Sequence, residues 1–571
     1  MKLLIDTTSF AKKTACALLA AWCVLVIRIS PAAEGAPPPQ AAIASAHPLA
    51  TEAGYEALRR GGNAFDAAVA VAAALAVVEP YSSGLGGGGF FLLHRAADGR
   101  EVMVDGRETA PAAITREFYF DSEGHPIHGA STQGGKSAAI PGMPAALVHV
   151  AQRYGKLPLG ASLAPAIRYA REGFEADPRY ARIAKLRERV LQDGVNTARV
   201  FLDNDRAPQA GFVLRQPELA VTLEQVARGG RDGFYAGHVA RALVAAANAA
   251  GGAWQLADLE RYQVVEREPV KFTYRGATIT AAALPSAGGI ALAQSLGMLE
   301  QFKLSSAGQP DTAHLVVEAL RRAFQDRALY LGDSDFVTVP VGRLVGRDYA
   351  RQRAATINPA AATRSDDLEG DKQVRAESGN TTHLSVIDAE GNRVAATLSI
   401  NWLFGSGIVA GDTGVLLNNE MDDFTLRPDV PNSYRLRGGV ANAIAPGKRP
   451  LSSMTPAFVE DAKGVLILGA PGGSRIVSQV LLAILEYLRN PQVDLQRLLA
   501  MPRYHHQYWP DRVEVEPEGF LPGWRAAMAA KGHAIQVVNR KWGNMQMVFK
   551  SRQTGAAQAA SDPRGVDVGG Y

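Results

Sequence analysis

The alternation of apolar and polar residues predicts a pair of helices near the start of the chain. A helical pattern runs from Glu52 to Gly61-Gly62, and Asn63 after it is typical of a helix N-cap. Residues 64–78 are so rich in alanine and valine that we expect a fully buried helix. A strand-like run follows at residues 90–94. The chain therefore starts with helices and continues into a sheet.

Farther along, the pattern changes from helical to strand-like. Amphipathic helices are predicted within residues 147–331, and the small, polar residues 357–380 are expected to form a loose surface segment. Two alternating runs, 383–388 and 393–400, flank a short polar turn and predict a β-hairpin. Two further strands and a helix are predicted at 464–468, 535–538 and 477–488. Strands and helices in both halves indicate a layered α/β or α+β fold.

The first 32 residues resemble a secretory signal peptide. Lysines precede an apolar run at 15–27, which is too short to span a bilayer. A flexible spacer is expected over residues 33–46. Both cysteines, Cys16 and Cys23, lie in the signal segment, so the mature chain would have no thiol. Disulfides, cysteine nucleophiles and thiolate metal sites are then excluded, and we expect a soluble periplasmic protein.

Composition and charge are those of an ordinary globular protein. The chain of 571 residues is 47% hydrophobic and 20% charged, and its length alone allows three or four domains. Its net charge is +4, of which the first 32 residues supply +3, from Lys2, Lys12, Lys13 and Arg28 against Asp6. The remainder has no overall attraction for phosphate backbones, which argues against nucleic-acid binding.

Several common site motifs are missing. No Gly-x-Ser-x-Gly sequence is present, so the usual serine hydrolase signature is absent. The glycine run 86–89 fits neither the dinucleotide-binding fingerprint nor the phosphate-binding loop, and is typical of a flexible turn. His505-His506 has no acidic ligand pattern beside it, so we expect no metal site. Serine, threonine, lysine and carboxylates remain as candidate nucleophiles.

A candidate nucleophile lies where the polar segment enters the hairpin. Asn380-Thr381-Thr382-His383 begins the first strand, and an N-terminal threonine is a strong nucleophile because its own α-amine can act as the base. Cutting the chain before Thr381 would free that amine at a sheet edge, and the hairpin returns Ser399 and Asn401 opposite it. Two threonines at a strand start are also explained by β-propensity alone, so both interpretations stay open on these residues.

At this point the sequence resembles the γ-glutamyltransferase (γ-glutamyltranspeptidase) family of N-terminal nucleophile hydrolases. The resemblance covers about residues 47–571 and includes ordered motifs along the whole of it. The motifs are Gly61-Gly62-Asn63-Ala64-Phe65-Asp66, Asp105-Gly106-Arg107-Glu108, Thr381-Thr382-His383, Leu416-Leu417-Asn418-Asn419-Glu420-Met421-Asp422-Asp423-Phe424, Lys448-Arg449-Pro450-Leu451-Ser452-Ser453-Met454 and Pro471-Gly472-Gly473-Ser474.

The resemblance implies an α+β fold, a four-layer αββα sandwich, and self-cleavage between Asn380 and Thr381. The precursor would give a large subunit, residues 47–380, and a small subunit, residues 381–571, which stay together as a heterodimer. The number of domains estimated from the chain length would then not apply. Thr381 would be the nucleophile, first on its own preceding peptide bond and then on substrate. His383 is expected to be structural.

The resemblance also implies a role for each site residue, and the residue types fit. A γ-glutamyl group has an α-carboxylate, an α-ammonium and the carbonyl under attack. Arg107 with Ser452 and Ser453 suits the carboxylate. Glu420, Asp423 and Asn401 suit the ammonium, the N–H groups of Gly472 and Gly473 the oxyanion, and Thr382 and Ser399 the nucleophile's hydroxyl. Taken without the resemblance, Arg107 could be a surface ion pair, Asp422-Asp423 a helix cap and Gly472-Gly473 a turn.

The implied reaction is acyl transfer from glutathione or a related γ-glutamyl amide to water or an acceptor amine, without metal or organic cofactor. Residues 425–435 resemble the family's lid loop, with Tyr434 as the aromatic that covers the glutamyl group; a lid counts against a polymer substrate. A cephalosporin or glutaryl acylase is the alternative enzyme, and the acidic pair Glu420 and Asp423 argues for glutamyl. A catalytically silent binding protein is the alternative of another class.

Overall fold

The structure is a computed structural model that describes residues 40–368, 381–427, 438–517 and 519–566. The expected signal peptide (1–32), Asn380 and Tyr434 lie outside the described residues. So does the first part of the expected spacer, residues 33–39. Within the described ranges, no helix combines the length and the apolar composition needed to cross a membrane.

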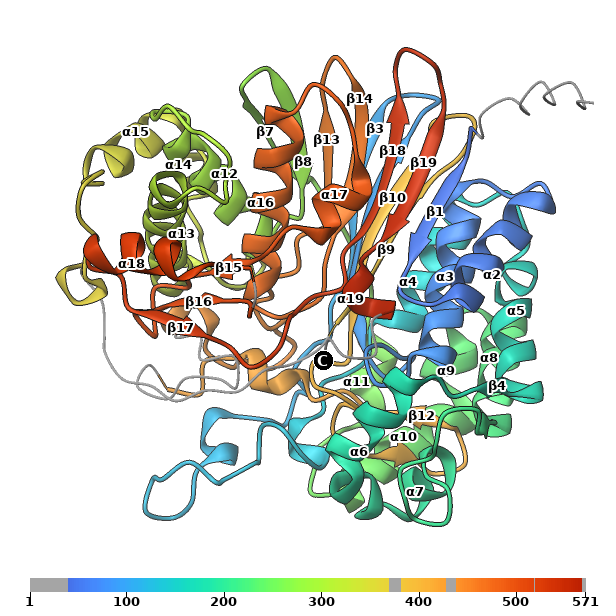
Figure 1. Ribbon diagram of the computed structural model, residues 1–571. Coiled ribbons are helices and arrows are strands. Elements are labelled where there is room, and N and C mark those ends of the chain that lie inside the picture. The colour runs from blue at the N-terminus through green and yellow to red at the C-terminus, as the bar shows by residue number, and fades with distance from the viewer. Residues whose placement is uncertain (1–39, 369–380, 428–437, 518, 567–571) are drawn as a thin grey trace, which may run out of the picture. The chain divides into compact units, whose positions relative to one another are not determined.

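Two six-stranded antiparallel sheets form the centre of residues 40–566 (Figure 1). In spatial order, the first sheet contains β1 (Ala42–Ser45), β9 (Thr382–Ile387), β10 (Arg393–Ser399), β2 (Gly88–Arg95), β3 (Arg100–Gly106) and β6 (Val265–Arg267). The second contains β19 (Ala557–Ser561), β18 (Gln546–Ser551), β14 (Gly464–Gly469), β13 (Ala457–Glu460), β8 (Ala277–Ala281) and β7 (Val270–Tyr274). Strands β9 and β10 contact β14, so the two sheets meet.

Helices lie on the outer side of each sheet. The first sheet and its helices share one hydrophobic core, built on α2 (Pro48–Arg59), α3 (Ala64–Val78), α4 (Met143–Tyr154), α5 (Leu159–Glu172), α6 (Pro178–Gln192), α7 (Val195–Phe201), α8 (Pro217–Gly229), α9 (Asp232–Tyr235), α10 (Gly237–Ala249) and α11 (Leu256–Arg261). The helices near the second sheet are α12 (Gly288–Leu299), α13 (Pro310–Tyr330), α14 (Val341–Leu344), α15 (Arg347–Ala355), α16 (Arg475–Arg489), α17 (Leu495–Ala500), α18 (Pro522–Ala530) and α19 (Pro563–Val566). The mixture of helices and antiparallel sheets confirms the predicted α+β class.

Local sequence patterns predicted several elements correctly. Helix α3 spans Ala64–Val78 and is buried along its whole length. The Asn63 side chain accepts hydrogen bonds from the N–H groups of Phe65 and Asp66, while the Asp66 carboxylate accepts from the Asn63 N–H. The hairpin β9–β10 forms with the expected turn. Two short two-stranded sheets also form, β11 (Val409–Ala410) with β12 (Val415–Leu416) and β4 (Phe174–Glu175) with β5 (Val213–Leu214).

The expected spacer over residues 33–46 is wrong at its end, because residues 42–45 form strand β1. This strand pairs with β9 in antiparallel register, Ala42 opposite Ile387 and Ser45 opposite Leu384. Four residues give too brief a pattern to predict a strand, and the partner strand β9 lies more than 300 residues farther along the chain. The folded part therefore begins before His47, and its first strand flanks the one that follows Thr381.

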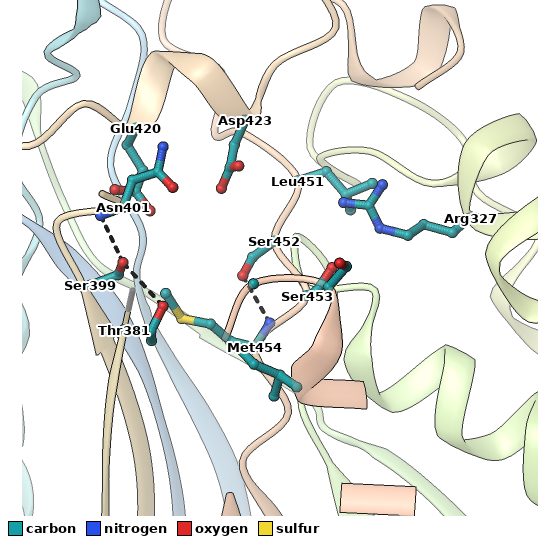
Figure 2. Close-up of a pocket in the computed structure, with 13 residues that line it drawn as sticks. Arg327, Thr381, Ser399, Asn401, Glu420, Asp423, Leu451, Ser452, Ser453 and Met454 are labelled. Carbon is teal, nitrogen blue, oxygen red and sulfur yellow. Dashed lines mark hydrogen bonds between the residues drawn. The ribbon is translucent and has the colours of Figure 1, made fainter. Parts of the chain in front are cut away.

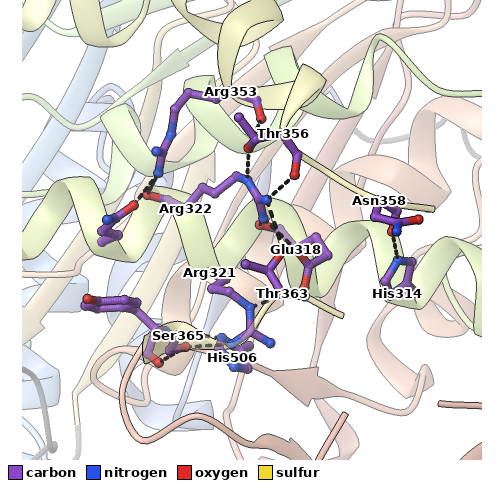
Figure 3. A network of polar contacts seen from close by, with 12 residues as sticks. His314, Glu318, Arg321, Arg322, Arg353, Thr356, Asn358, Thr363, Ser365 and His506 are labelled. Carbon is purple, nitrogen blue, oxygen red and sulfur yellow. Dashed lines mark hydrogen bonds and ion pairs between the residues drawn. The ribbon is translucent and has the colours of Figure 1, made fainter. Parts of the chain in front are cut away.

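The expectation of a loose segment at 357–380 is wrong for its described part. Helix α13 carries a buried polar network that holds this segment (Figure 3). The Arg322 guanidinium, paired with Glu318 on the same helix at 2.7 Å, donates to the Thr363 hydroxyl at 3.1 Å. Arg321 donates to the Ser365 hydroxyl at 2.6 Å, and Ser365 donates in turn to the Tyr508 carbonyl at 2.6 Å. The network thus joins parts of the chain on both sides of the expected cleavage point. A small three-stranded sheet, β15 (Tyr504–His505), β16 (Val513–Val515) and β17 (Ile535–Val537), lies beside it.

Candidate active site

Thr381 lies at the mouth of the β9–β10 hairpin, directly opposite Ser399. The register pairs Thr382 with Leu398, which brings the next residues out to the strand ends. The Thr381 and Ser399 hydroxyl oxygens are 3.5 Å apart, and both residues are buried. The Ser399 oxygen also accepts a hydrogen bond from the Asn401 N–H at 2.7 Å. The predicted nucleophile therefore has the Ser399 hydroxyl beside it, and the backbone N–H of Asn401 orients that hydroxyl.

The structure does not bring the Thr382 hydroxyl to Thr381, because successive side chains of a strand point to opposite faces. The Thr382 hydroxyl is buried and interacts instead with the Glu79 carboxyl. His383 shares the face of Thr381, and its ring bonds the Thr397 and Ser385 hydroxyls at 2.9 and 3.1 Å. Burial lowers the pKa of His383 to about 3, so the ring is neutral. Its position fits the structural role expected for it.

A narrow pocket opens beside the Thr381 hydroxyl (Figure 2). Its lining residues are Arg327, Thr381, Ser399, Asn401, Glu420, Asp423, Leu451, Ser452, Ser453, Met454, Gly473, Ser474 and Ile476. The pocket therefore gathers most of the predicted site residues from distant parts of the chain. Its free volume is about 20 Å³, little more than a water molecule needs, so a larger ligand must displace side chains.

Arg107 lies behind the pocket wall and is not part of the lining. It follows β3, its side chain is 0% exposed, and its guanidinium is ion-paired with both Glu420 and Asp423. Its Nε donates to the Pro450 carbonyl at 3.2 Å, and a third carboxylate, Glu108, lies 3.5 Å from Nη1. The resemblance implies that Arg107 and the acidic pair bind opposite charges of one substrate. In the structure, Arg107 instead forms ion pairs with Glu420 and Asp423.

Burial controls the protonation of this acidic cluster. It raises the pKa values of Glu420 and Asp423, and the positive charge of Arg107 opposes that shift. Burial and the negative charge of Glu420 raise the pKa of Glu108 well above its usual range. Neither Glu108 oxygen has a hydrogen-bond partner within the described ranges, so we assign this carboxyl as neutral at pH 7. The carboxyl groups that pair with Arg107 and also line the pocket are Glu420 and Asp423.

Two serines and two glycines complete the pocket. The segment of Ser452 is held by backbone bonds, since the Ser452 N–H donates to the Pro285 carbonyl at 2.8 Å. The Ser452 hydroxyl accepts from the Met454 N–H at 3.0 Å, whereas the Ser453 hydroxyl is buried without a partner among the described residues. The Ser453 hydroxyl can therefore donate a hydrogen bond to a ligand in the pocket.

The loop between β14 and α16 supplies backbone N–H groups. Gly472 and Gly473 have φ values of 127° and 57°, which favour glycine, and they come just before the first turn of α16. No described residue accepts a hydrogen bond from the N–H group of either glycine. Gly473 lines the pocket beside Thr381 and Gly472 precedes it. Such a pair of donors can hold an oxyanion that forms next to the Thr381 hydroxyl.

Sequence reasoning missed five lining residues: Arg327, Leu451, Met454, Ser474 and Ile476. Leu451, Met454 and Ser474 lie inside quoted motifs and Ile476 follows one closely, which is the signal that could have found them. Arg327 lies on α13, far from every motif. The doublet His505-His506 is also explained: both rings are buried, and burial lowers each pKa to about 4. No group of three or more potential metal ligands occurs in the part of the chain that the structure describes.

Comparisons with known proteins agree on one family. The sequence profile of the family described as Gamma-glutamyltranspeptidase matches residues 50–570. The chain is 40% identical to the glutathione hydrolase proenzyme of Escherichia coli (strain K12), over 92% of this chain and 91% of the relative. It is 36% identical to the acylase ACY 1 proenzyme of Pseudomonas sp. (strain SE83), over 92% and 93% of the two chains. The crystal structure of cephalosporin acylase from Bacillus halodurans superposes with a TM-score of 0.81 at 28% identity, covering 94% of this chain and 98% of that one.

Proposed function

Since the chain belongs to the gamma-glutamyltranspeptidase family and is an enzyme, we propose that it cleaves the γ-glutamyl amide bond of glutathione and related compounds. The observation that carries the proposal is the pocket itself. The Thr381 hydroxyl lies at one end of it, and Glu420 and Asp423 provide negative charge within it. A γ-glutamyl group has its reacting carbonyl and its ammonium at two ends of a short chain, which matches that arrangement.

The first step makes the nucleophile. We propose cleavage between Asn380 and Thr381, which divides the chain into a large subunit (47–380) and a small subunit (381–571) that remain a heterodimer. The cleavage frees the α-amine of Thr381. This amine belongs to the same residue as the hydroxyl, so it can accept the hydroxyl proton as a general base. Ser399, 3.5 Å from that hydroxyl, supports its orientation.

In the acyl-transfer step, the Thr381 oxygen attacks the γ-carbonyl and its proton passes to the α-amine. Negative charge develops on the carbonyl oxygen, and the N–H groups of Gly472 and Gly473, which have no acceptor among the described residues, stabilise it. The C–N bond then breaks, the amine product takes the proton, and a γ-glutamyl-threonine ester remains. Water or an acceptor amine attacks that ester and regenerates the enzyme. No step requires a metal or an organic cofactor.

The acidic pair selects the substrate. Glu420 and Asp423, with Asn401 nearby in the lining, suit the α-ammonium, while Ser452 and Ser453 suit the α-carboxylate. For Arg107 to reach that carboxylate, as expected from the resemblance, it must exchange one of its present carboxylate partners. Tyr434, the proposed lid residue, lies in a stretch that the structure leaves undescribed.

The fold and the N-terminal segment complete the proposal. The two contacting sheets with outer helices support a four-layer αββα sandwich of the N-terminal nucleophile type. The signal-like first 32 residues support export, with the mature enzyme in the periplasm. Glutathione, other γ-glutamyl compounds and acceptor amines or water are its proposed small-molecule partners.

An acylase activity is the second candidate, because an acylase proenzyme and a cephalosporin acylase are among the similar proteins. Acylase substrates of the glutaryl type lack the α-ammonium. The pair Glu420 and Asp423 would gain no attraction from such a substrate, whereas it attracts the ammonium of a γ-glutamyl compound, which favours γ-glutamyl compounds.

Two measurements test the proposal. Intact mass and N-terminal sequencing of the purified enzyme should give two chains, the smaller starting at Thr381. The p-nitroanilides of γ-glutamate, glutarate and 4-aminobutyrate differ only in the α-ammonium or α-carboxylate, so their kcat/KM values measure each group. We expect the γ-glutamyl compound to be the best substrate by at least about 100-fold, since it alone satisfies both charges. Preference for the glutaryl compound would establish an acylase instead.

The acidic pair should also produce a pH dependence that is specific to the ammonium. Because burial raises the pKa values of Glu420 and Asp423, they take up protons at a higher pH than exposed carboxyls and lose attraction for the ammonium as the pH falls. The ratio of kcat/KM for γ-glutamyl over glutaryl anilide should therefore drop by up to about tenfold per pH unit on the acid side. Both substrates share the titration of the Thr381 amine, so it cancels. A ratio that is constant from pH 5 to pH 9 would contradict this assignment.

A further inference from the structure

A buried ion pair lies behind the strand that begins after Thr381. Glu79 directly follows helix α3 and is 0% exposed, and its Oε1 is 2.9 Å from Nη1 of Arg179, near the start of α6. Burial raises the pKa of Glu79, and the charge of Arg179 opposes that shift. Neither residue is part of the pocket lining. Apolar residues of similar volume often give equal stability at such a site, so stability alone does not account for the pair.

The carboxylate of this pair contacts the strand of the nucleophile. The Glu79 carboxyl interacts with the Thr382 hydroxyl, on the face of β9 opposite to that of Thr381. Thr382 is 1% exposed, so water does not compete for this contact. Because the peptide unit between Thr381 and Thr382 is planar, fixing Thr382 also limits the directions in which Thr381 can leave the strand. Glu79 therefore acts on the nucleophile through one rigid peptide.

The guanidinium of the pair supports the loop that follows Ser399. The Arg179 Cζ lies 5.3 Å from the centre of the Tyr81 ring, a cation–π contact. The Tyr81 carbonyl accepts a hydrogen bond from the Phe404 N–H at 3.3 Å, and the centres of the two rings are 6.1 Å apart. Arg179 is thus connected through Tyr81 to the turn that Asn401 begins.

This loop needs support, because Asn401 and Phe404 both have left-handed backbone. Their φ values are 69° and 58°, which residues other than glycine rarely adopt, and a bulky aromatic residue least of all. Such conformations persist only where the surrounding structure holds them. The Asn401 N–H is also the donor that orients the Ser399 hydroxyl, at 2.7 Å. Relaxation of the loop would therefore move the hydroxyl that lies beside the nucleophile.

The contacts of the pair join the two proposed subunits. Glu79, Tyr81 and Arg179 precede the proposed cleavage point, whereas Thr382 and Phe404 follow it. Cleavage would leave the strand that starts at Thr381 without a covalent connection at its new end. Buried contacts from the large subunit then help to keep that end in place.

We propose that the Glu79–Arg179 pair positions the nucleophile, because Glu79 fixes the first residue of β9 and Arg179 supports the loop that orients Ser399. Both are positioning residues, since neither touches the pocket. The inference rests on the proposed function for the role of Thr381. It requires a loss in self-cleavage and in acyl transfer without a loss in ligand binding.

The first test compares Glu79→Gln, which keeps the shape of the side chain and removes its charge, with the wild type. Self-cleavage, followed as the uncleaved fraction against time by intact mass, should slow about tenfold. Once the variant is processed, kcat/KM for γ-glutamyl anilide should fall about tenfold, because small displacements of reacting atoms are costly in rate. The affinity for glutamate, measured by calorimetry, should stay within about twofold, since the pocket lining is unchanged.

Glu101→Gln is the matched control, because it removes a buried carboxylate from the same sheet. The Glu101 side chain is 7% exposed and lies 3.6 Å from the Arg393 guanidinium. Arg393 begins β10 and Ser399 ends it, so this pair is at the turn end of the hairpin, about 20 Å from the nucleophile by strand length. The control should lose stability while its cleavage rate and kcat/KM stay within about twofold of the wild type.

A double variant separates positioning from stability. Glu79→Leu combined with Arg179→Met leaves no unpaired charge buried, so its melting temperature should return toward that of the wild type. Its cleavage rate and kcat/KM should stay low, because the contacts to Thr382 and Tyr81 are still missing. Recovery of both stability and rate would overturn the inference. So would wild-type rates in Glu79→Gln, or an equal kinetic loss in Glu101→Gln.

Thr382→Val takes the place of Glu79→Gln if that variant does not fold. It removes the hydroxyl that meets the Glu79 carboxyl and keeps the branched shape, so we expect the same kinetic pattern with glutamate affinity retained. Wild-type cleavage and turnover in Thr382→Val would refute the Glu79 contact as a positioning device.

The outcomes separate this inference from the proposed function. If the wild type cleaves glutaryl but not γ-glutamyl anilide, the proposed function fails, and the same variants test the inference on the glutaryl substrate. If the wild type is processed and cleaves γ-glutamyl anilide while Glu79→Gln equals it in both rates, the function stands and the positioning role is refuted.

Discussion

Replacing Thr381 with alanine is expected to leave a single uncleaved chain without measurable acyl transfer. The substitution removes the hydroxyl that lies in the pocket 3.5 Å from that of Ser399, and with it the proposed attacking atom for cleavage and for turnover. Removing a covalent nucleophile lowers kcat by at least about 10⁴-fold in comparable enzymes. Intact mass and γ-glutamyl anilide turnover measure the two effects separately.

Thr381→Ser is the matched control for that variant. It retains the hydroxyl and loses only the methyl group, so we expect slower but complete cleavage into two chains and easily measured turnover. A two-chain, active Thr381→Ala enzyme would refute the role of Thr381 in both steps. An unfolded Thr381→Ala protein is not expected, because the side chain lies at a strand end and makes one long hydroxyl contact.

Replacing Arg107 with methionine should cause the largest loss of stability in this region. The guanidinium is fully buried between Glu420 and Asp423, and methionine fills similar volume without charge. Breaking a buried pair leaves uncompensated charge, which costs about 3–5 kcal/mol in free energy of unfolding. Urea denaturation of the processed enzyme measures it. Arg59→Met is the control: Arg59 and its partner Glu52 have side chains 61% and 56% exposed, so we expect a change below about 1 kcal/mol.

The loss in Arg107→Met should depend on pH with a defined sign. Without Arg107, the largest opposition to the burial that raises the pKa values of Glu420 and Asp423 is lost, so the folded state binds protons more tightly than the unfolded state. Stability is then retained at low pH and lost as the pH rises through the raised pKa values. The deficit against wild type should be larger at pH 8 than at pH 5.5. An equal deficit at both would mean that lost packing, and not unpaired charge, dominates.

The fold was predictable where neighbouring residues decide the structure. Helix α3 has the predicted bounds because Asn63 caps it and its uniform small apolar residues can only be buried. The β9–β10 hairpin follows from alternation and a polar turn, and its register alone brings Ser399 opposite Thr381. Strand β1 escaped prediction because four residues carry too little pattern without their distant partner.

The sequence by itself therefore determined the family, the α+β class and the candidate nucleophile, because motifs and periodicity are local properties. Only the tertiary structure decided which charges meet. It pairs Arg107 with Glu420 and Asp423, more than 300 residues away, and brings Arg327 of α13 into the pocket lining. No spacing along the chain encodes such pairings, since they depend on which buried side chains share one low-dielectric space once the two sheets have packed.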